Sequence, residues 1–451
     1  MTQAAAGAVK GGITVANQGL PKIDYGKGVY LYDKDGRRYI DGSSGPAVYS
    51  VGHGNEEVNE AISRQLARVA HGYRYLFTSD PLEELTELIR TSCGADLSSM
   101  VFVCGGSEAV ESALKLALQY HSARGEFTRR HFISRRRSWH GNTLGALSVS
   151  DFLERRRPFE GALIPASFLS AVNAYRPPEG VAPDQLAEYC AAELEQEILR
   201  RGPQNVAAFI FEPVVGAAGG VVPAPDGYAV RIRQICDRFG VLMIADEVMC
   251  GSGRCGSWRA LEQDGVAPDI MTIAKGLAGG YQPLGATVYS RKVSDVITAA
   301  HGGPLTGHTF TGHTAACAAG VAVQRIFRRE KLVERVRSVG PQLMNMCRES
   351  LGELDAVGDI RGRGFFVGIE FVVDRKTKTP FPADCQLYLR IRRHALERGL
   401  ICYPCGGNVD GVRGDTVIVA PPYIATESEL GEIVDKLGAA TRAALAELKA
   451  G

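Results

Sequence analysis

Short aliphatic runs alternate with amphipathic segments from residue 63 to residue 325 of this chain. The amphipathic segments carry apolar residues at helical spacing, for example over 108–120 and 227–239. This alternation is typical of consecutive β–α–β units, which place strands side by side in a largely parallel sheet. The clearest strand candidates are 100–104, 207–211, 241–245, 270–274 and 286–290. We therefore predict an α/β fold with a large, mixed but mostly parallel sheet flanked by helices.

The two ends of the chain have a different pattern. Residues 29–41 are typical of a hairpin with its turn at 34–36. After residue 325, a long charged helix precedes a strand pair around 364–373, and a last helix follows Pro422. Both ends are expected to form one small α+β domain beside the large one. The expected limits are 1–62 for the N-terminal part of the small domain, 63–325 for the large domain and 326–451 for the C-terminal part.

The charge balance argues against polyanionic partners. The chain of 451 residues has 51 Lys+Arg and 50 Asp+Glu, a formal net charge of +1, so neither nucleic acid nor a membrane surface is an expected partner. Two short basic runs, 135–137 and 155–157, interrupt this balance. We expect them to be solvated faces, with a phosphate-binding patch as the alternative.

Residues 1–20 lack the basic start and apolar core of a secretory signal, and no apolar run reaches the ~18 residues of a membrane span. Eleven cysteines without framework spacing favour reduced thiols. Cys402 and Cys405 are expected to pack in a loop, because no second pair or histidine stands at metal-binding distance in the sequence. These features predict a cytoplasmic protein without a metal site.

Several predicted strands end in polar residues, and ligands of open α/β sheets bind beyond such carboxyl ends. After the first strand, Gly105 and Gly106 permit close backbone approach, and a helix starts near Ser107. Free N–H groups at a helix start bind phosphate well. The alternative for Ser107 is an ordinary N-cap.

Two further strand ends carry charge. The run that ends in Asp246 and Glu247 places carboxylates at the mouth of a dry strand, which requires a metal, an arginine or a protonated ring nitrogen, or else a helix N-cap. Lys275 ends another apolar strand, where burial lowers the pKa of an amine and makes it a nucleophile. The alternative for Lys275 is a side chain that reaches solvent from the strand end.

Trp139 follows the strand at 131–134 and offers a flat surface for a planar ligand, unless it is a structural tryptophan. A phosphate cradle, an aromatic platform, a carboxylate and a lysine together suit a phosphorylated, cationic heterocycle with an aldehyde. Pyridoxal phosphate (PLP) is such a molecule.

Longer stretches of the chain resemble the class III PLP-dependent aminotransferases of fold type I. The resemblance covers nearly the whole chain in family order and spacing. The segments that carry it are 38–45 (RYIDGSSG), 105–117 (GGSEAVESALKLA), 139–150 (WHGNTLGALSVS), 212–220 (EPVVGAAGG), 244–256 (IADEVMCGSGRCG), 268–286 (PDIMTIAKGLAGGYQPLGA), 307–323 (GHTFTGHTAACAAGVAV), 358–364 (GDIRGRG) and 420–423 (APPY).

The resemblance implies that Lys275 forms a Schiff base with the cofactor aldehyde and then moves the proton of the reaction. It implies that Asp246 pairs with the pyridine nitrogen, and that Trp139 and Val248 lie on the two faces of the ring. The family usually has Tyr or Phe at the position of Trp139.

The same resemblance assigns the phosphate to Gly106 and Ser107, and adds His140 and Glu212 to the cofactor-binding residues. Thr309 is implied to reach the phosphate of a partner subunit. A homodimer with shared active sites, or a tetramer built from such dimers, is therefore expected.

The implied reaction moves an amino group from an amine or ω-amino acid to a keto acid such as pyruvate or 2-oxoglutarate. Ala217 stands where relatives acting on ornithine or γ-aminobutyrate carry Glu, and Met249 stands where they carry Gln, as in the ω-amine branch. An epimerase, mutase or decarboxylase of the same fold is an alternative. A non-catalytic PLP-binding protein is a further one.

The resemblance also indicates pocket residues. Ala47 replaces a bulky aromatic and would open one wall, and Tyr75 and Phe77 would line the pocket, from the partner subunit in one arrangement. Arg413 lies near the position of an arginine that binds the acceptor carboxylate. The alternative for Arg413 is a surface pair with Asp415.

Overall fold

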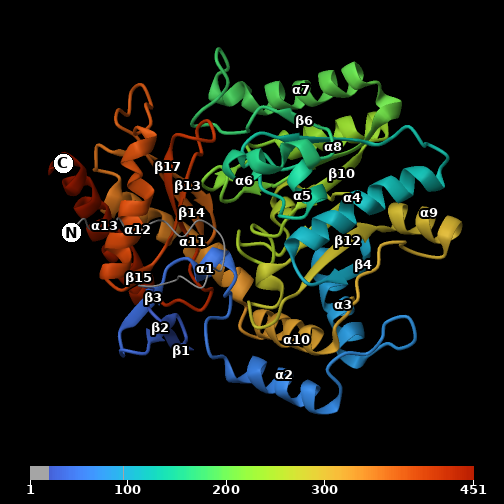
Figure 1. Ribbon diagram of the computed structural model, residues 1–451, viewed down its shortest axis with the longest axis horizontal. Helices are drawn as coiled ribbons and strands as arrows, with labels where there is room; N and C mark the ends of the chain where they lie inside the picture. Colours follow the sequence, from blue (N-terminus) through green and yellow to red (C-terminus); the bar gives the residue numbers. More distant parts are fainter. Residues whose placement is uncertain (1–19, 95, 451) are drawn as a thin grey trace.

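The computed structural model describes residues 20–94 and 96–450. Residues 1–19 hold part of the expected small domain and most of the segment in which no secretory signal is found, and they lie outside the described residues. Figure 1 shows segments from both ends of the chain gathered in one part of the molecule, beside a larger part made from the middle of the chain. None of the helices in the described ranges has the length and apolar character needed to cross a bilayer.

The middle of the chain forms a seven-stranded sheet in the order β4–β12–β11–β10–β7–β5–β6. Only β12 is antiparallel to its neighbours, so the predicted mixed, mostly parallel sheet is confirmed. β6 is the one strand of this sheet that the sequence pattern did not indicate, because only one of its four side chains is fully buried. The strands are β4 (Leu97–Val103), β5 (His131–Arg135), β6 (Ala166–Leu169), β7 (Val206–Phe211), β10 (Leu242–Asp246), β11 (Ile270–Ile273) and β12 (Gly285–Ser290).

Both faces of this sheet are buried, as the side chains of β10 illustrate. Leu242 and Ile244 pack in the apolar cluster that contains one face of α4, whereas Met243 and Ala245 pack in the cluster that contains α7 and α8. Burial on both faces explains why the strands are continuously apolar. The helices of this part are α3 (Asp80–Cys93), α4 (Gly106–Ala123), α5 (Leu144–Ser148), α6 (Leu153–Arg156), α7 (Leu186–Arg201), α8 (Tyr228–Phe239), α9 (Arg291–His301) and α10 (Thr314–Arg329).

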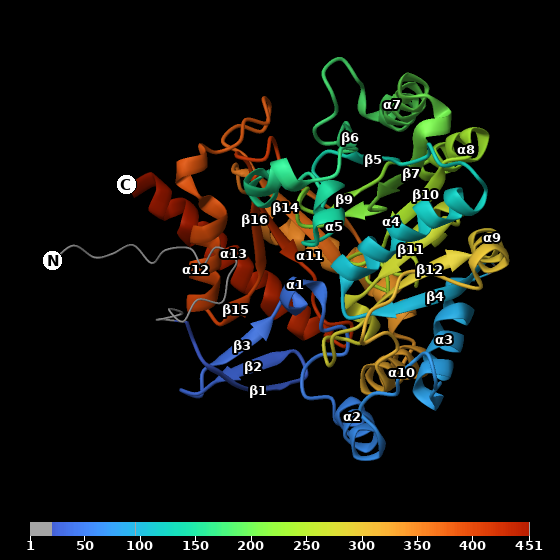
Figure 2. The ribbon, with the colours of Figure 1, turned by 45° about the vertical axis from the view of Figure 1, so that its right-hand side comes forward.

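Two four-stranded sheets form the other part (Figure 2). In the first sheet, the expected N-terminal hairpin supplies β2 (Tyr30–Asp33) and β3 (Arg38–Asp41), and β3 pairs in parallel with β15 (Leu400–Ile401). β1 (Ile23–Lys27), which lies before the predicted hairpin, pairs with β2. The second sheet is antiparallel and consists of β13 (Val357–Arg363), β14 (Phe366–Phe371), β17 (Asp415–Val419) and β16 (Tyr403–Gly406). The remaining elements are α1 (Ser44–Ala47), α2 (Glu56–Arg68), α11 (Leu332–Leu351), α12 (Leu387–Glu397), α13 (Glu427–Ala450), and the short pair β8 (Val214–Val215) and β9 (Val222–Pro223).

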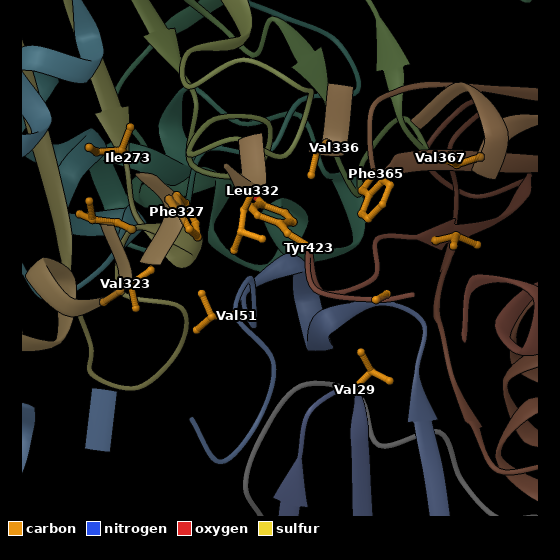
Figure 3. Close-up of a cluster of buried hydrophobic side chains, with 14 of the residues drawn as sticks. Val29, Val51, Ile273, Val323, Phe327, Leu332, Val336, Phe365, Val367 and Tyr423 are labelled. Atoms are coloured by element: carbon orange, nitrogen blue, oxygen red, sulfur yellow. The ribbon is translucent and has the colours of Figure 1, made fainter. Parts of the chain in front are cut away.

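One apolar cluster connects the two parts (Figure 3). Its members are fully buried side chains that lie far apart in the sequence. Those labelled in Figure 3 are Val29, Val51, Ile273, Val323, Phe327, Leu332, Val336, Phe365, Val367 and Tyr423. The two parts therefore pack through a continuous hydrophobic core.

The expected domain limits at residues 62 and 325 fall inside α2 and α10. These two helices pack against each other. The limits themselves stay a prediction.

Two helical glycines offer a test of the packing between α11 and the turn from β13 to β14. A Cβ on Gly340 would come within 2.7 Å of the Gly364 Cα, whereas a Cβ on Gly431 of α13 would meet open space. We expect Gly340→Ala to destabilise the protein by about 1–3 kcal/mol through overpacking. Gly431→Ala should stabilise it by up to about 1 kcal/mol, because alanine is the better helix former. Thermal unfolding followed by circular dichroism measures both, and a shift of the same sign in both variants would contradict the close contact.

Candidate active site

A cavity of about 380 Å³ opens beyond the carboxyl ends of the parallel strands. Segments that directly follow β4, β5, β7, β10 and β11 line it, together with the residues that lead into the antiparallel β12. The lining includes the predicted site residues Gly106, Ser107, Trp139, His140, Glu212, Asp246, Val248 and Lys275. Sheet topology thus brings together side chains that the sequence separates by up to 169 positions, from Gly106 to Lys275.

Asp246 is the buried carboxylate of the site, at the last position of β10. Its Oδ2 lies 2.7 Å from His140 Nδ1, and its Oδ1 accepts hydrogen bonds from Thr272 Oγ1 at 2.9 Å and from the Val248 N–H at 3.1 Å. A carboxylate has further lone pairs, so it can still accept from a cationic ring nitrogen. His140 therefore orients Asp246.

Glu212 is a second buried carboxylate in the cavity lining. Its oxygens accept from the Trp139 N–H at 2.9 Å and from the Gly216 N–H at 2.8 Å. Burial raises the pKa of Glu212 to about 6. The charge of His140 acts to lower this pKa, and the charge of Asp246 acts to raise it. These bonds hold the backbone of Trp139 at the cavity wall.

Lys275 follows β11 with a positive φ of 47°, a conformation that is rare for a residue with a side chain. Its Nζ donates to the Pro46 carbonyl of the N-terminal segment at 2.9 Å. Desolvation by the surrounding protein lowers the pKa of the amine to about 8. The negative charges of Asp246 and Glu212 act in the other direction and raise this pKa, but desolvation is the larger effect. With this pKa, a substantial fraction of the lysine is unprotonated near pH 8, and the unprotonated amine can act as a nucleophile and a base.

The start of α4 forms the phosphate-sized end of the cavity. Ser107 Oγ accepts from the Asn142 N–H at 2.9 Å, so its own hydrogen can be donated to a ligand. A Cβ on Gly106 would lie 2.8 Å from Val248 Cγ1, and a Cβ on Gly141 would lie 2.6 Å from Ser107 Oγ. Glycine at these two positions keeps the cradle open between the helix start and Val248.

The second acid of the DE pair has a structural role. The Glu247 carboxylate accepts hydrogen bonds from the Ala260 and Leu261 N–H groups at the start of a short 3-10 helix, Ala260–Asp264, at 2.5 and 3.1 Å. Burial raises the pKa of Glu247 to about 7. The N-cap alternative concerned Asp246, but the next helix of the described chain starts only at Ala260, and Glu247 binds that helix start from a distant position. Asp246 instead lines the cavity.

Other predicted site residues lie outside the cavity lining. Thr309 is exposed, and its carbonyl lies 3.1 Å from His71 Nε2. Tyr75 and Phe77 are exposed as well, at 75% and 64%, in the segment between α2 and α3. Ala47 is buried in the apolar cluster that also contains Ala217, beside the lining residue Val48.

Arg413 is exposed, and its Nε donates to Asp410 Oδ2 at 2.7 Å. The structure therefore does not bring Arg413 to the cavity, and the alternative pair with Asp415 does not form either. Asp415 instead accepts from the Tyr388 N–H. The loop that carries Arg413 is closed on itself by the Asp410 side chain, which also accepts from the Arg413 N–H.

The two basic runs are not simply solvated faces. Arg135 is buried against the rings of Phe211 and Tyr228 and donates to the Glu212 carbonyl at 2.7 Å. Arg156 donates to three carbonyls at the end of α5. Arg155 lies over the Trp139 ring at 4.6 Å. The sequence shows the basic residues themselves, but no sequence signal indicated that they pack on aromatic rings near the site.

The residues present fit pyridoxal phosphate. The start of α4 brings glycine and the Ser107 hydroxyl to the cavity, which suits an anion, Trp139 and Val248 offer apolar surfaces, and the Asp246 carboxylate is oriented by its hydrogen bonds and can accept from a cationic donor. In the part of the chain that the structure describes, no three His, Cys, Asp or Glu side chains gather as metal ligands. Fold and site together define a PLP-dependent enzyme.

Comparisons with known proteins narrow this class. The model of the family described as aminotransferase class-III matches residues 15–441. An uncharacterized aminotransferase of Schizosaccharomyces pombe is 40% identical over 437 residues, which cover 96% of this chain and 95% of that protein. The chain belongs to the class III aminotransferase family.

Solved structures agree with this assignment. An (S)-enantioselective omega-transaminase from Thermomicrobium roseum superposes with a TM-score of 0.91 at 32% identity, over 98% of this chain and 97% of that one. A PLP-bound amine transaminase from an uncultivated Pseudomonas species superposes with a TM-score of 0.89 at 33% identity, over 98% of this chain and 99% of that one. The predicted fold type I architecture, PLP cofactor and aminotransferase activity are thereby confirmed.

The lowered pKa of Lys275 predicts how its amine reacts with an acylating reagent in the cofactor-free protein. Reactivity requires the neutral amine, so labelling of Lys275 should rise with pH through a midpoint near 8, below the ordinary value of 10.5. Asp246→Asn removes a negative charge that favours the protonated amine, and the midpoint should fall further. Peptide mass spectrometry across a pH series measures both midpoints. A midpoint near that of free lysine would contradict the desolvated environment.

Proposed function

We propose that this enzyme transfers the amino group of a primary amine or ω-amino acid to a 2-oxo acid such as pyruvate or 2-oxoglutarate. The observation that carries the proposal is the site itself, in which Lys275, Asp246 and the α4 start share a cavity with a small apolar wall. Ala217 and Met249 form that wall together with Val48. An apolar wall without a charged side chain suits the alkyl part of an amine donor.

When bound, the cofactor supplies an electron sink that stabilises negative charge on the substrate carbon which loses its proton. Lys275 would take that proton and return it at the neighbouring position, since its lowered pKa suits both directions. Asp246, held by His140 and Thr272, would keep the proton on the ring nitrogen. Gly106 and Ser107 would hold the phosphate and so set the position of the ring.

The proposed assembly is a homodimer with shared active sites. An apolar patch covers the segments before α3 and before α10, with exposed large side chains at Tyr73, Tyr75, Leu76, Phe77, Leu305 and Phe310. A cavity of about 190 Å³ under this patch is lined by Phe310 and His313 and shares Cys104, Gln282 and Leu284 with the site cavity. A second copy on this patch would bury it and place Thr309 beside the neighbouring phosphate cradle. Eleven free cysteines support the cytoplasm as the compartment.

Lys275→Ala tests the proposed catalytic role. We expect the purified variant to lack the long-wavelength absorbance of the lysine-bound cofactor and to lose transamination by at least about 10²-fold, because general acid–base catalysis is removed. Activity with an amine panel against pyruvate and 2-oxoglutarate, and the absorbance spectrum, are the measurements. Lys34→Ala, at an exposed lysine in the turn between β2 and β3, is the control. Full activity of Lys275→Ala would contradict the proposed catalytic role of Lys275.

Phe310→Glu tests the proposed interface. A charge in the middle of an apolar patch disfavours burial of that patch, so the variant should elute as a monomer by size exclusion with light scattering. Activity should fall together with dimer content, because Thr309 no longer reaches the partner's site. Leu199→Glu, at an exposed leucine of α7, is the matched control. A dimeric Phe310→Glu variant would place the interface elsewhere.

A further inference from the structure

Arg155 is a cation that packs on the cavity residue Trp139 and has no carboxylate partner among the residues that the structure describes. Its guanidinium lies 4.6 Å from the centroid of the Trp139 ring and 5.0 Å from that of Phe152. The two rings are edge to face, with centroids 5.7 Å apart. Since Trp139 lines the cavity, Arg155 packs against a residue of the cavity wall, while Arg155 itself is exposed.

The positive charge of Arg155 acts on the Lys275 amine. Its charge contributes to the lowered pKa of Lys275. It also opposes the burial that raises the pKa of Tyr403 and Cys405, two residues of β16 in the other sheet. The charge of Arg155 therefore acts on groups of β16 as well as on Lys275, while its side chain packs on Trp139. Figure 1 shows α6, which carries Arg155, at the side of the large sheet that faces β13, β14 and β17 of the other sheet.

Stacking leaves the binding edge of the guanidinium available. The planar face of an arginine packs on an aromatic ring, while its N–H groups point outward in the plane and match the two oxygens of a carboxylate. No hydrogen bond or ion pair joins the Arg155 side chain to another residue within 20–94 and 96–450. Arg155 is exposed, so its desolvation on binding an anion costs little.

The other arginines near the site are engaged. Arg413 is bound by Asp410, and Arg135 donates to the Glu212 carbonyl. Arg254 is buried and donates to the carbonyls of Phe365 and Pro421. Arg155 is thus the arginine at this cavity that combines proximity to Lys275 with free donors.

We propose that Arg155 binds the carboxylate of the substrate, so that ω-amino acids and 2-oxo acids are preferred over neutral amines and aldehydes of the same size. This inference rests on the proposed function, because it names which class of donor and acceptor the same site selects. Arg155 is then a specificity-determining residue: it holds the far end of the substrate while Lys275 acts on the carbon that bears nitrogen.

The test compares 4-aminobutyrate with butylamine, which differ only by a carboxylate in place of a methyl group. Each donor is mixed with the holoenzyme without acceptor, and the loss of the lysine-bound cofactor absorbance is followed in a single turnover. Arg155→Met should lower the second-order rate constant for 4-aminobutyrate by about 10- to 100-fold, the effect of losing a charge-assisted bond. The constant for butylamine should change by no more than about twofold. Arg155→Lys should restore part of the loss.

Arg157→Met is the matched control, since Arg157 belongs to the same basic run, is exposed and does not contact Trp139. It should leave both rate constants unchanged. An equal loss with both donors in Arg155→Met would assign the residue a structural role at Trp139, and no loss with either would remove it from the site. Both outcomes overturn the inference.

A binding measurement separates this inference from the proposed function. Glutarate, an unreactive dicarboxylate, is titrated into the holoenzyme, and the fluorescence of Trp139 beside Arg155 reports binding, while Trp258 is buried and bonded to Gln324. We expect saturable quenching in the wild type that Arg155→Met weakens by at least about tenfold. If neither donor reacts with the wild type, the proposed donor class fails, and the glutarate titration still decides on Arg155. Equal binding of glutarate by wild type and Arg155→Met would overturn it.

Discussion

A carboxylate buried at the end of β10 sets the arrangement of the whole site. Asp246 loses hydration in the folded protein, and an uncompensated buried charge costs several kcal/mol. Compensation comes from His140 in the connection after β5, from Thr272 of β11, and from the Val248 N–H. The Asp246 carboxylate has lone pairs for a further donor, and a protonated ring nitrogen would be one. The same cluster of negative charge opposes the desolvation that makes the Lys275 amine reactive.

The cavity also depends on the two ends of the chain. The carbonyl of Pro46, just after β3, accepts from the Lys275 amine, and β16 supplies residues whose pKa responds to charges in the site. β3 and β15 pair in one sheet, with Ile40 opposite Leu400. A contact between segments more than 300 residues apart therefore positions one wall of the active site. The apolar cluster of Figure 3 holds this pairing against the large sheet.

Much of the site was predictable because it lies at strand ends. A buried parallel strand is a continuous apolar run, so its carboxyl end is visible in the sequence as the point where polar residues begin. Ser107, Trp139, Asp246 and Lys275 were found in this way, and the structure brings all four to one cavity. In the structure Arg413 lies on the surface, because its loop is closed by Asp410, and nothing in the local pattern distinguishes Asp410 from Asp415 as the partner.

Local pattern was sufficient to name the chemical groups of the site and the class of cofactor, because strand periodicity and strand ends depend on neighbouring residues. The folded chain alone assigned roles among equivalent groups. It placed the Glu247 carboxylate on the N–H groups of Ala260 and Leu261, and it placed Arg155 on Trp139 while Arg156 bonds to the end of α5. Adjacent residues of the same type differ in which way their side chains point, and that direction is set by packing against segments distant in the sequence.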